Sequence, residues 1–230
     1  MTILYSDFSI LPVIDLHTHT FFSDGELIPS ELVRRLEVMS YRAVAITDHA
    51  DSSNLDFIVP RIVKASEELN RVQSVKVVPG VELTHVPPGL IGSMISTARD
   101  LGAALVVVHG ESPVEPVAEG TNQAALEGGA DILAHPGLIS SEQAYLAAEK
   151  GVSLEVSGRS GHCLANGHVA RVATETGARL VINSDAHGPH DLMTKSFAAK
   201  VVEGAGLPEG SLQELLSNAL TLLGKIGYSL

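Results

Sequence analysis

The sequence predicts an α/β fold, a distorted seven-stranded (β/α)7 barrel with parallel strands and surrounding helices. Seven short apolar runs alternate with amphipathic helical stretches along the 230 residues. Such alternation is typical of parallel strands that are joined by right-handed crossovers. Because one barrel fills this length, we expect a single domain over residues 1–230.

The expected strands have Val, Ile and Leu on consecutive positions, as strands buried on both faces do. The first two lie at residues 13–16 and 43–47, and the third runs from residue 75 to residue 83. The remaining four are expected at residues 104–108, 131–134, 153–156 and 179–183.

Apolar residues at helical spacing occupy the stretches between these runs. One helix begins at Pro29, and a second requires Pro60 in its first turn and carries its apolar stripe on to Val72. A third stripe spans residues 91–101, and residues 211–223 form a closing amphipathic helix. Glycines suited to helix ends precede three of the strands, namely Gly102, Gly129 and Gly177.

The composition indicates a cytoplasmic protein without a membrane span. Cys163 is the only cysteine, so no internal disulfide can form and a reducing compartment is expected. No apolar run reaches the roughly 18–20 residues of a membrane span, and residues 1–9 lack the features of a signal peptide. A net charge of -12, with 4% aromatic residues and no Trp, argues against an extended nucleic-acid-binding face.

Residues that can bind metal ions follow six of the seven expected strands. They are His17, His19 and Asp24 after the first, His49 after the second, Glu82 at the third, His109 at the fourth, His135 at the fifth, and Asp185 and His187 after the seventh. The carboxyl ends of these strands converge on one rim, where the active sites of β/α barrels lie. Carboxylates and imidazoles packed together without a cation would leave buried charge unpaired, so the pattern predicts a metal centre.

The motifs at these strand ends resemble those of the PHP (polymerase and histidinol phosphatase) superfamily. They are His17-Thr18-His19, Ser23-Asp24-Gly25, Thr47-Asp48-His49, Gly80-Val81-Glu82, Ala134-His135-Pro136 and Ser184-Asp185-Ala186-His187, in the order of the family. The resemblance covers nearly the whole chain. It implies a barrel of seven β/α units, a set of three divalent ions and the hydrolysis of phosphate esters.

Position by position, the resemblance also implies which residues hold each ion. His17, His19, Glu82 and Asp185 would bind the first ion, and Glu82 would bridge to a second ion held by His109 and His135. Asp24, His49 and His187 would bind the third. Imidazole and carboxylate ligands suit Zn, Mn and Fe equally, and the sequence does not choose among them.

Such a site implies a mechanism in which the ions activate a water molecule for attack on phosphorus. The carboxylates Glu82, Asp185 and Asp24 are therefore the expected catalytic residues, acting through the ions they hold. The substrate is expected to be small and phosphorylated. Histidinol phosphate, another small phosphomonoester, a short nucleotide and the 5′ end of an oligonucleotide all remain open.

The loop after the sixth strand supplies the expected substrate-binding residues Arg159, His162 and Asn166. A guanidinium can hold a phosphate with two parallel hydrogen bonds. The alternative for Arg159 is a solvated arginine, or one paired with a surface carboxylate such as Glu155.

Two other functions compete with a phosphoesterase. An amidohydrolase barrel also opens with His-x-His, but Glu82 as a ligand and the absence of a strand-end lysine for a bridging carbamate argue against it. A non-catalytic scaffold is the second alternative. It would not require all nine ligand positions to be kept.

Overall fold

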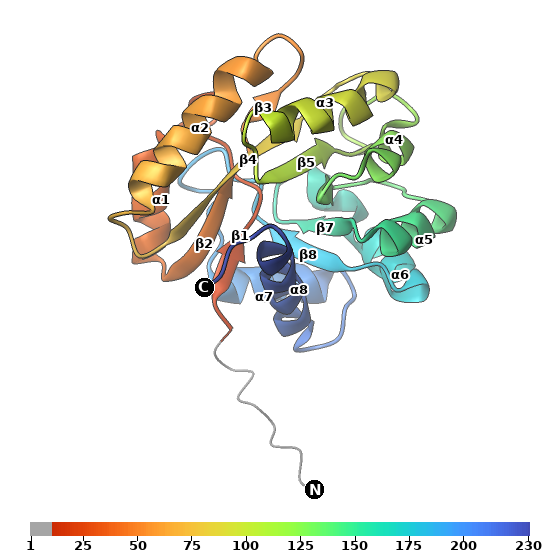
Figure 1. Cartoon of the computed structure of the whole chain (residues 1–230). Helices are drawn as coiled ribbons and strands as arrows, with labels where there is room; N and C mark the ends of the chain where they lie inside the picture. Colours follow the sequence, from red (N-terminus) through yellow and green to blue (C-terminus); the bar gives the residue numbers. More distant parts are fainter. Residues whose placement is uncertain (1–10) are drawn as a thin grey trace, which may run out of the picture.

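In the computed structural model, which describes residues 11–230, seven parallel strands form a nearly closed barrel in the order β1-β2-β4-β5-β6-β7-β8 (Figure 1). This confirms the predicted (β/α)7 architecture. The strands are β1 (Val13–Asp15), β2 (Tyr41–Ile46), β4 (Lys76–Leu83), β5 (Leu105–His109), β6 (Ile132–Ala134), β7 (Ser153–Ser157) and β8 (Leu180–Asn183). A further two-residue strand, β3 (His49–Ala50), pairs with β4 and sets His49 opposite Glu82.

Over residues 11–230, eight α-helices pack against these strands. They are α1 (Pro29–Val38), α2 (Leu55–Leu69), α3 (Pro88–Asp100), α4 (Thr121–Gly128), α5 (Ser141–Lys150), α6 (Asn166–Thr176), α7 (Lys195–Gly204) and α8 (Ser211–Lys225), with the 3-10 helix η2 (His162–Ala165) before α6. As predicted, Gly129 and Gly177 end α4 and α6 with positive φ, and Gly102 follows α3 with φ 104°. Among residues 11–230, no helix is both long enough and apolar enough to cross a membrane.

The barrel closes between its first and last strands at their carboxyl ends. Asp185 N donates to His17 O at 3.0 Å, and His19 N donates to Ala186 O at 2.8 Å. The buried carboxylate of Asp15 also accepts from Ser184 N. These bonds bring the His17–His19 segment beside Asp185, which lies far away in the sequence.

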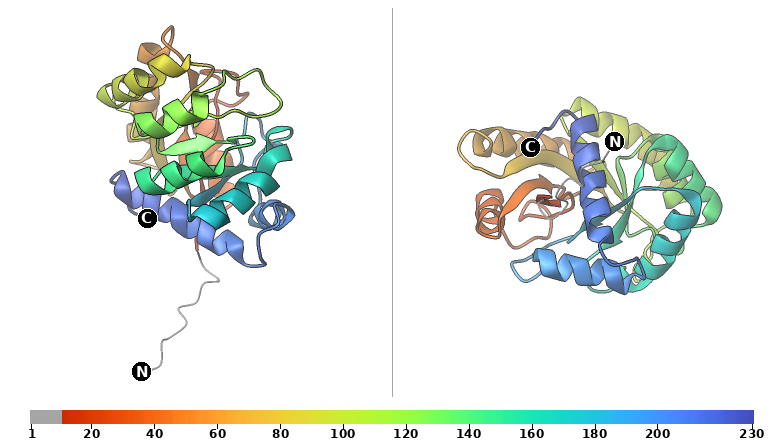
Figure 2. Two further views of the ribbon diagram at one scale, coloured as in Figure 1. Left: turned by 90° about the vertical axis from the view of Figure 1, so that its right-hand side faces the viewer. Right: turned by 90° about the horizontal axis from the view of Figure 1, so that it is seen from below.

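The apolar core has two layers. The larger layer lies between the strands and the surrounding helices. The smaller layer fills the barrel with side chains such as Leu16, Val78 and Leu105, and Leu222 and Leu223 of α8 pack against it. Seen from below, α8 crosses the barrel end (Figure 2), which confirms the predicted closing helix. Because this end is plugged by α8, the interior of the barrel can open only at the other end.

Two details of α2 differ from the prediction. The helix begins at Leu55, so Pro60 lies in its second turn and not in its first. Pro60 is exposed, and so is Asp56, whose carbonyl loses its helical donor and can instead bond water. The helix ends at Leu69, and Val72 lies beyond it with 79% of its surface exposed. The apolar stripe therefore does not continue to Val72.

Candidate metal centre

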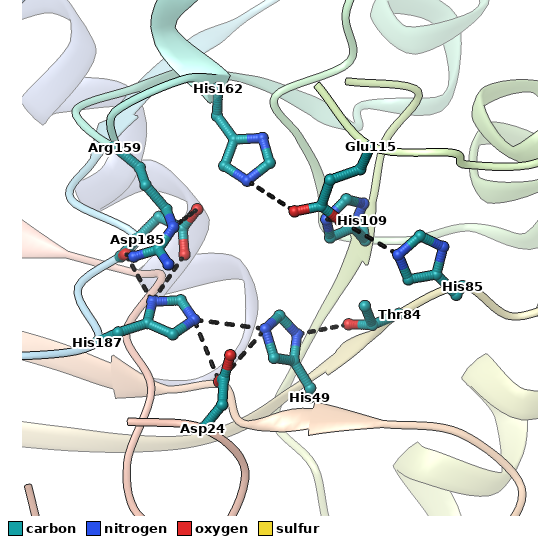
Figure 3. Close-up of a pocket in the computed structure, with 10 residues that line it drawn as sticks. All are labelled: Asp24, His49, Thr84, His85, His109, Glu115, Arg159, His162, Asp185 and His187. Carbon is teal, nitrogen blue, oxygen red and sulfur yellow. Dashed lines mark hydrogen bonds and ion pairs between the residues drawn. The ribbon is translucent and has the colours of Figure 1, made fainter. Parts of the chain in front are cut away.

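The predicted ligands lie at the carboxyl ends of the strands, around a cavity of about 250 Å³ (Figure 3). The barrel wall thus brings together residues spread over most of the chain. The cavity is lined by Asp24, His49, Thr84, His85, His109, Glu115, Arg159, His162, Asp185 and His187. Deeper in the same end of the barrel, His17, His19, Glu82 and His135 are buried.

The backbone at two of these strand ends is strained. His135 follows β6 with φ 27°, and Asp185 follows β8 with φ 54°. A non-glycine residue with positive φ is uncommon, and such residues tend to gather at functional sites. At the end of β5, Gly110 has no room for a side chain, because an added Cβ would lie 2.3 Å from Ala134 O. The neighbouring His109 and His135 are thereby held close.

The clearest ligand group consists of Asp24, His49 and His187. His187 Nε2 lies 3.2 Å from Asp24 Oδ1 and 3.4 Å from His49 Nε2, and His49 Nε2 lies 3.5 Å from Asp24 Oδ1. Two ligand atoms on one tetrahedral zinc ion are about 3.3 Å apart, given metal–ligand distances of about 2.0–2.2 Å. The three atoms therefore form a triangle of the size that one ion requires.

The tautomers of four histidines favour metal binding. Nδ1 of His187 lies 3.0 Å from Asp185 O and Nδ1 of His109 lies 3.1 Å from Gly110 O. A carbonyl oxygen only accepts, so each Nδ1 carries a hydrogen and a neutral ring directs the Nε2 lone pair into the site. Nδ1 of His17 and of His49 face carboxylates in the same way, at 2.8 Å from Glu155 and 2.6 Å from Glu82. Metal-binding histidines are usually oriented by such bonds.

Glu82 and Asp185 lie among the deepest imidazoles. Glu82 Oε1 is 3.3 Å from His17 Nε2 and 3.7 Å from His135 Nε2, and Asp185 Oδ1 is 3.2 Å from His19 Nε2. Glu82 Oε1 thus lies between a ligand predicted for the first ion and one predicted for the second. Several buried atoms here find no hydrogen-bond partner among residues 11–230, including Glu82 Oε1, His17 Nε2 and both ring nitrogens of His19.

The pKa values of the buried acidic groups and imidazoles in this cluster are shifted in different directions. Burial favours protonated Glu82, but the neighbouring His17 and His49 outweigh it and hold the pKa of Glu82 well below its usual range. Burial together with the carboxylates of Glu82 and Glu155 raises the pKa of Asp185 well above its usual range. Burial lowers the pKa of His19 and of His135 far enough to keep both rings neutral, the form that binds metals.

His109 and His135 lie together as predicted, and a third imidazole joins them. The ligand atoms of His109, His135 and His162 all lie within 4.8 Å of one another. His162 stacks on His135 with ring centroids 4.0 Å apart. The sequence predicted His162 as a substrate contact, and the structure places it against two predicted ligands as well as on the cavity wall.

Glu155 is not a surface carboxylate, so the partner suggested above for Arg159 was wrong. It is fully buried inside the barrel on β7, where its Oε2 accepts from His17 Nδ1 and from Asn183 Nδ2. The signal was present in the sequence, since a lone Glu between Leu154 and Val156 interrupts a buried strand. On a strand with alternating faces, Glu155 points into the barrel while its neighbours pack against helices.

Asp48 is a second positioning residue that the sequence analysis did not single out. Its Oδ1 accepts from the backbone N–H groups of Thr20 and Ser23, at 2.8 Å and 3.1 Å, and from the Ser23 hydroxyl. Its Oδ2 accepts from the Thr20 hydroxyl at 2.7 Å. Asp48 thereby ties the end of β2 to the loop that carries Asp24.

The three predicted substrate-binding residues lie in different surroundings. Arg159 lines the cavity, donates to Asp185 O at 3.2 Å and keeps 30% of its side chain exposed. His162 lines it as well. The side-chain amide of Asn166 accepts a hydrogen bond from Ser157 N and donates one to Ser157 O, so this residue has a structural role. Asn166 therefore stabilises the end of β7 and does not line the cavity.

The imidazole and carboxylate groups of this site are arranged as ligands of divalent ions are. Carboxylate and imidazole atoms converge in groups with ligand-sized spacings, and buried polar atoms that lack hydrogen-bond partners point into them. A cation would satisfy these atoms and compensate the buried carboxylates.

Known proteins are similar in sequence to this chain over most of its length. An uncharacterised protein, MJ1295, of Methanocaldococcus jannaschii is 50% identical over 204 residues, covering 88% of this chain and 94% of that protein. A probable phosphatase of Shewanella halifaxensis is 28% identical, covering 85% of this chain and 86% of the relative.

Two solved structures share the fold. A chain in the cryo-EM structure of archaeal ribonuclease P with mature tRNA has a TM-score of 0.71 and 16% identity, covering 94% of this chain and 92% of that chain. Histidinol phosphate phosphatase of Lactococcus lactis, solved with zinc, L-histidinol and phosphate, has a TM-score of 0.56 and 16% identity, covering 94% of both chains. The family model of the PHP domain matches residues 15–178, which include seven of the nine predicted ligands. The chain therefore belongs to the PHP domain family, as the motifs had indicated.

Proposed function

We propose that this chain is a metal-dependent phosphoesterase that hydrolyses a small phosphomonoester or a nucleotide at a centre of three divalent ions. The observation that carries the proposal is the inward-facing set of imidazole lone pairs and carboxylates. It includes a complete ligand triangle at Asp24, His49 and His187. Membership of the PHP domain family and similarity to a probable phosphatase support phosphate esters as substrates.

The proposed ligands follow the sequence-based assignment. His17, His19, Glu82 and Asp185 would hold the first ion, His109 and His135 would hold the second together with Glu82, and Asp24, His49 and His187 would hold the third. When bound, Zn, Mn or Fe would supply an activated water and charge stabilisation for in-line attack on phosphorus.

The chain's own residues orient this chemistry. Glu155 and the backbone carbonyls of Gly110 and Asp185 fix the rings of His17, His109 and His187. Arg159 lies on the cavity wall beside Asp185, where its guanidinium can hold nonbridging phosphate oxygens. A cavity of about 250 Å³ is below the usual range for drug-sized ligands, about 300–1,000 Å³, which suits a phosphate with a small part of its leaving group.

A substrate panel tests the proposal. Chelator-free protein would be assayed for metal content and then incubated with phosphomonoesters, nucleotides, phosphodiesters, amides and lactones, with Zn, Mn or Fe added. We expect more than one equivalent of metal and turnover of phosphate esters only. Turnover of amides or lactones alone would favour the amidohydrolase alternative. Bound metal without any turnover would favour the scaffold, and absence of bound metal would reject the proposal.

A further inference from the structure

Two residues outside the nine predicted ligands reach the metal centre from separate loops. Glu115 lies on the segment between β5 and α4, and His162 opens η2 after β7. Figure 3 shows the Glu115 carboxylate between the rings of His85, His109 and His162. Its Oε2 lies 3.1 Å from His85 Nε2 and 3.2 Å from His109 Nε2, and its Oε1 lies 3.4 Å from His162 Nε2.

The contact between Glu115 and His109 is unfavourable for neutral His109 in the absence of a cation. His109 donates its Nδ1 hydrogen to Gly110 O, so the neutral ring presents a lone pair at Nε2. That lone pair faces a carboxylate oxygen at 3.2 Å, a separation that two ligands can have when each lies about 2.0–2.2 Å from one ion. A cation bound by both atoms removes the repulsion.

His162 is held in a matching orientation. Its Nδ1 is 2.7 Å from the Ser112 hydroxyl, which leaves Nε2 directed towards the cluster. The ring is 6% exposed, stacks on His135 and meets His109 edge-on at 84°. Ser112 and Glu115 lie on the same segment, so one stretch of chain both orients His162 and supplies the carboxylate.

We propose that Glu115 and His162 are further ligands of the ion held by His109 and His135. This inference rests on the proposed metal-dependent function. The second ion would then be held by the imidazoles of His109, His135 and His162, by the Glu115 carboxylate and by Glu82. Imidazole and carboxylate donors suit Zn, Mn and Fe.

Metal titration of matched variants tests this inference. Parent protein, Glu115→Gln and His162→Gln would be stripped with chelator and titrated calorimetrically with Zn²⁺ and Mn²⁺, followed by elemental analysis. Two controls lose the same groups elsewhere, namely Glu119→Gln on the same segment and His190→Gln at the surface. Loss of a residue that only orients a metal ligand typically costs tenfold to a hundredfold in affinity, so loss of a ligand itself should cost more. We expect a loss of about a hundredfold or more for one ion in both variants, and none in the controls.

A second measurement separates metal binding from packing. Gln has nearly the shape of Glu and lacks the charge that faces the His109 lone pair, so Glu115→Gln should melt at or above the parent's temperature in chelator and gain less than the parent when metal is added. Parent-like affinities for every ion in both variants would overturn the inference while leaving the proposed function intact. A loss of melting temperature for Glu115→Gln that is equal with and without metal would also overturn it. If the parent itself binds no metal, the proposed function fails first.

Discussion

At the scale of single residues, His17 shows how neighbouring carboxylates set the charge and the orientation of a predicted ligand. Burial disfavours its charged form, but Glu155, Glu82 and Asp185 together raise the pKa of His17 well above its ordinary value. A proton and a metal ion therefore compete for Nε2, while Glu155 keeps Nδ1–H turned away from the centre. The buried carboxylate makes the ring a stronger ligand, because a hydrogen bond at Nδ1 raises its basicity.

Replacing Glu155 should weaken the first ion. In Glu155→Leu the His17 Nδ1–H loses its acceptor, whereas Glu155→Gln keeps an oxygen and loses only the charge. We expect a tenfold to hundredfold loss of metal affinity for the Leu variant and a smaller loss for Gln, measured by metal titration. The exposed Glu149→Gln on α5 is the control. Parent-like affinity of a folded Glu155→Leu protein would exclude this role.

Glu82 and His187 should differ in how many ions depend on them. Glu82→Gln removes the proposed bridge and should lose the first two ions with nearly all turnover. His187→Ala removes one corner of the outer triangle and should spare those two ions. Metal stoichiometry by elemental analysis, measured together with activity, checks the contrast. Equal loss of every ion in both variants would contradict the partition.

Arg159 should act on phosphate and not on metal content. Its guanidinium donates in a fixed fork that Lys cannot reproduce. We expect Arg159→Lys to keep the parent's metal content and to lose roughly tenfold to a hundredfold in kcat/KM for phosphate esters, about 1.5–3 kcal/mol. Inorganic phosphate should also inhibit the variant less strongly. Unchanged turnover with unchanged phosphate inhibition would remove Arg159 from substrate binding.

The sequence was informative about residues whose chemistry depends on a strand end. His109 and His135 directly follow apolar runs, so the convergence of parallel strands was enough to bring them together. Glu115 and Asp48 depend instead on the path of a loop and on hydrogen bonds across it, and no hydrophobic period encodes either. Glu155 was misplaced because its polarity was weighed more heavily than the buried strand around it.

At the scale of elements, the proposed third ion would depend on a loop more than on a strand. Asp24 keeps 58% of its side chain exposed, and the loop from Thr20 to Ser23 that leads to it is anchored by Asp48 at the end of β2. The strand end is rigid because its neighbours are buried on both faces. Through its hydrogen bonds, the Asp48 carboxylate restrains an otherwise exposed turn.

Removing the Asp48 carboxylate should loosen this loop. Asp48→Ala leaves the Thr20 and Ser23 N–H groups and two hydroxyls without acceptors, which should lower the free energy of unfolding by about 1–3 kcal/mol. The third ion should be lost before the other two. Urea unfolding and metal counting check both effects, and Ser23→Ala, which removes only one donor, should give a smaller change. A variant that kept all ions would show that Asp24 needs no such anchor.

Elements with a single strong signal were predicted well, and those with competing signals were not. The seven strands and α8 follow from continuous apolar runs and a clear helical stripe. In α2 the prediction treated Pro60 as a start signal, although the turn at Asp51 and Asn54 begins the helix earlier. The strand β3 has only two residues and follows from the register of β4, which sequence spacing does not reveal.

At the scale of the whole molecule, the apolar side chains of α8 and the candidate metal centre lie at opposite ends of the barrel. Leu222 and Leu223 of α8 cover one end with apolar side chains. The other end holds Glu82, Glu155 and Asp185 among imidazoles, in a buried region where charge is costly without a counter-ion. The ligands come from nearly every strand, so a bound ion links elements that are far apart in the sequence.

Removal of metal should therefore lower the stability of the entire barrel. An ion that binds only the folded chain stabilises it by about 4 kcal/mol when free metal exceeds Kd a thousandfold. For a domain of this size, that corresponds to a rise in Tm of roughly 8–16 °C for each such ion. Scanning calorimetry in chelator and in excess Zn²⁺ or Mn²⁺ would measure the shift, with Glu82→Gln as the variant in which it should shrink most. A Tm that is the same with and without chelator would mean that the ligands do not hold ions in the folded protein, because ions bound by buried groups from many strands cannot leave without a change in stability.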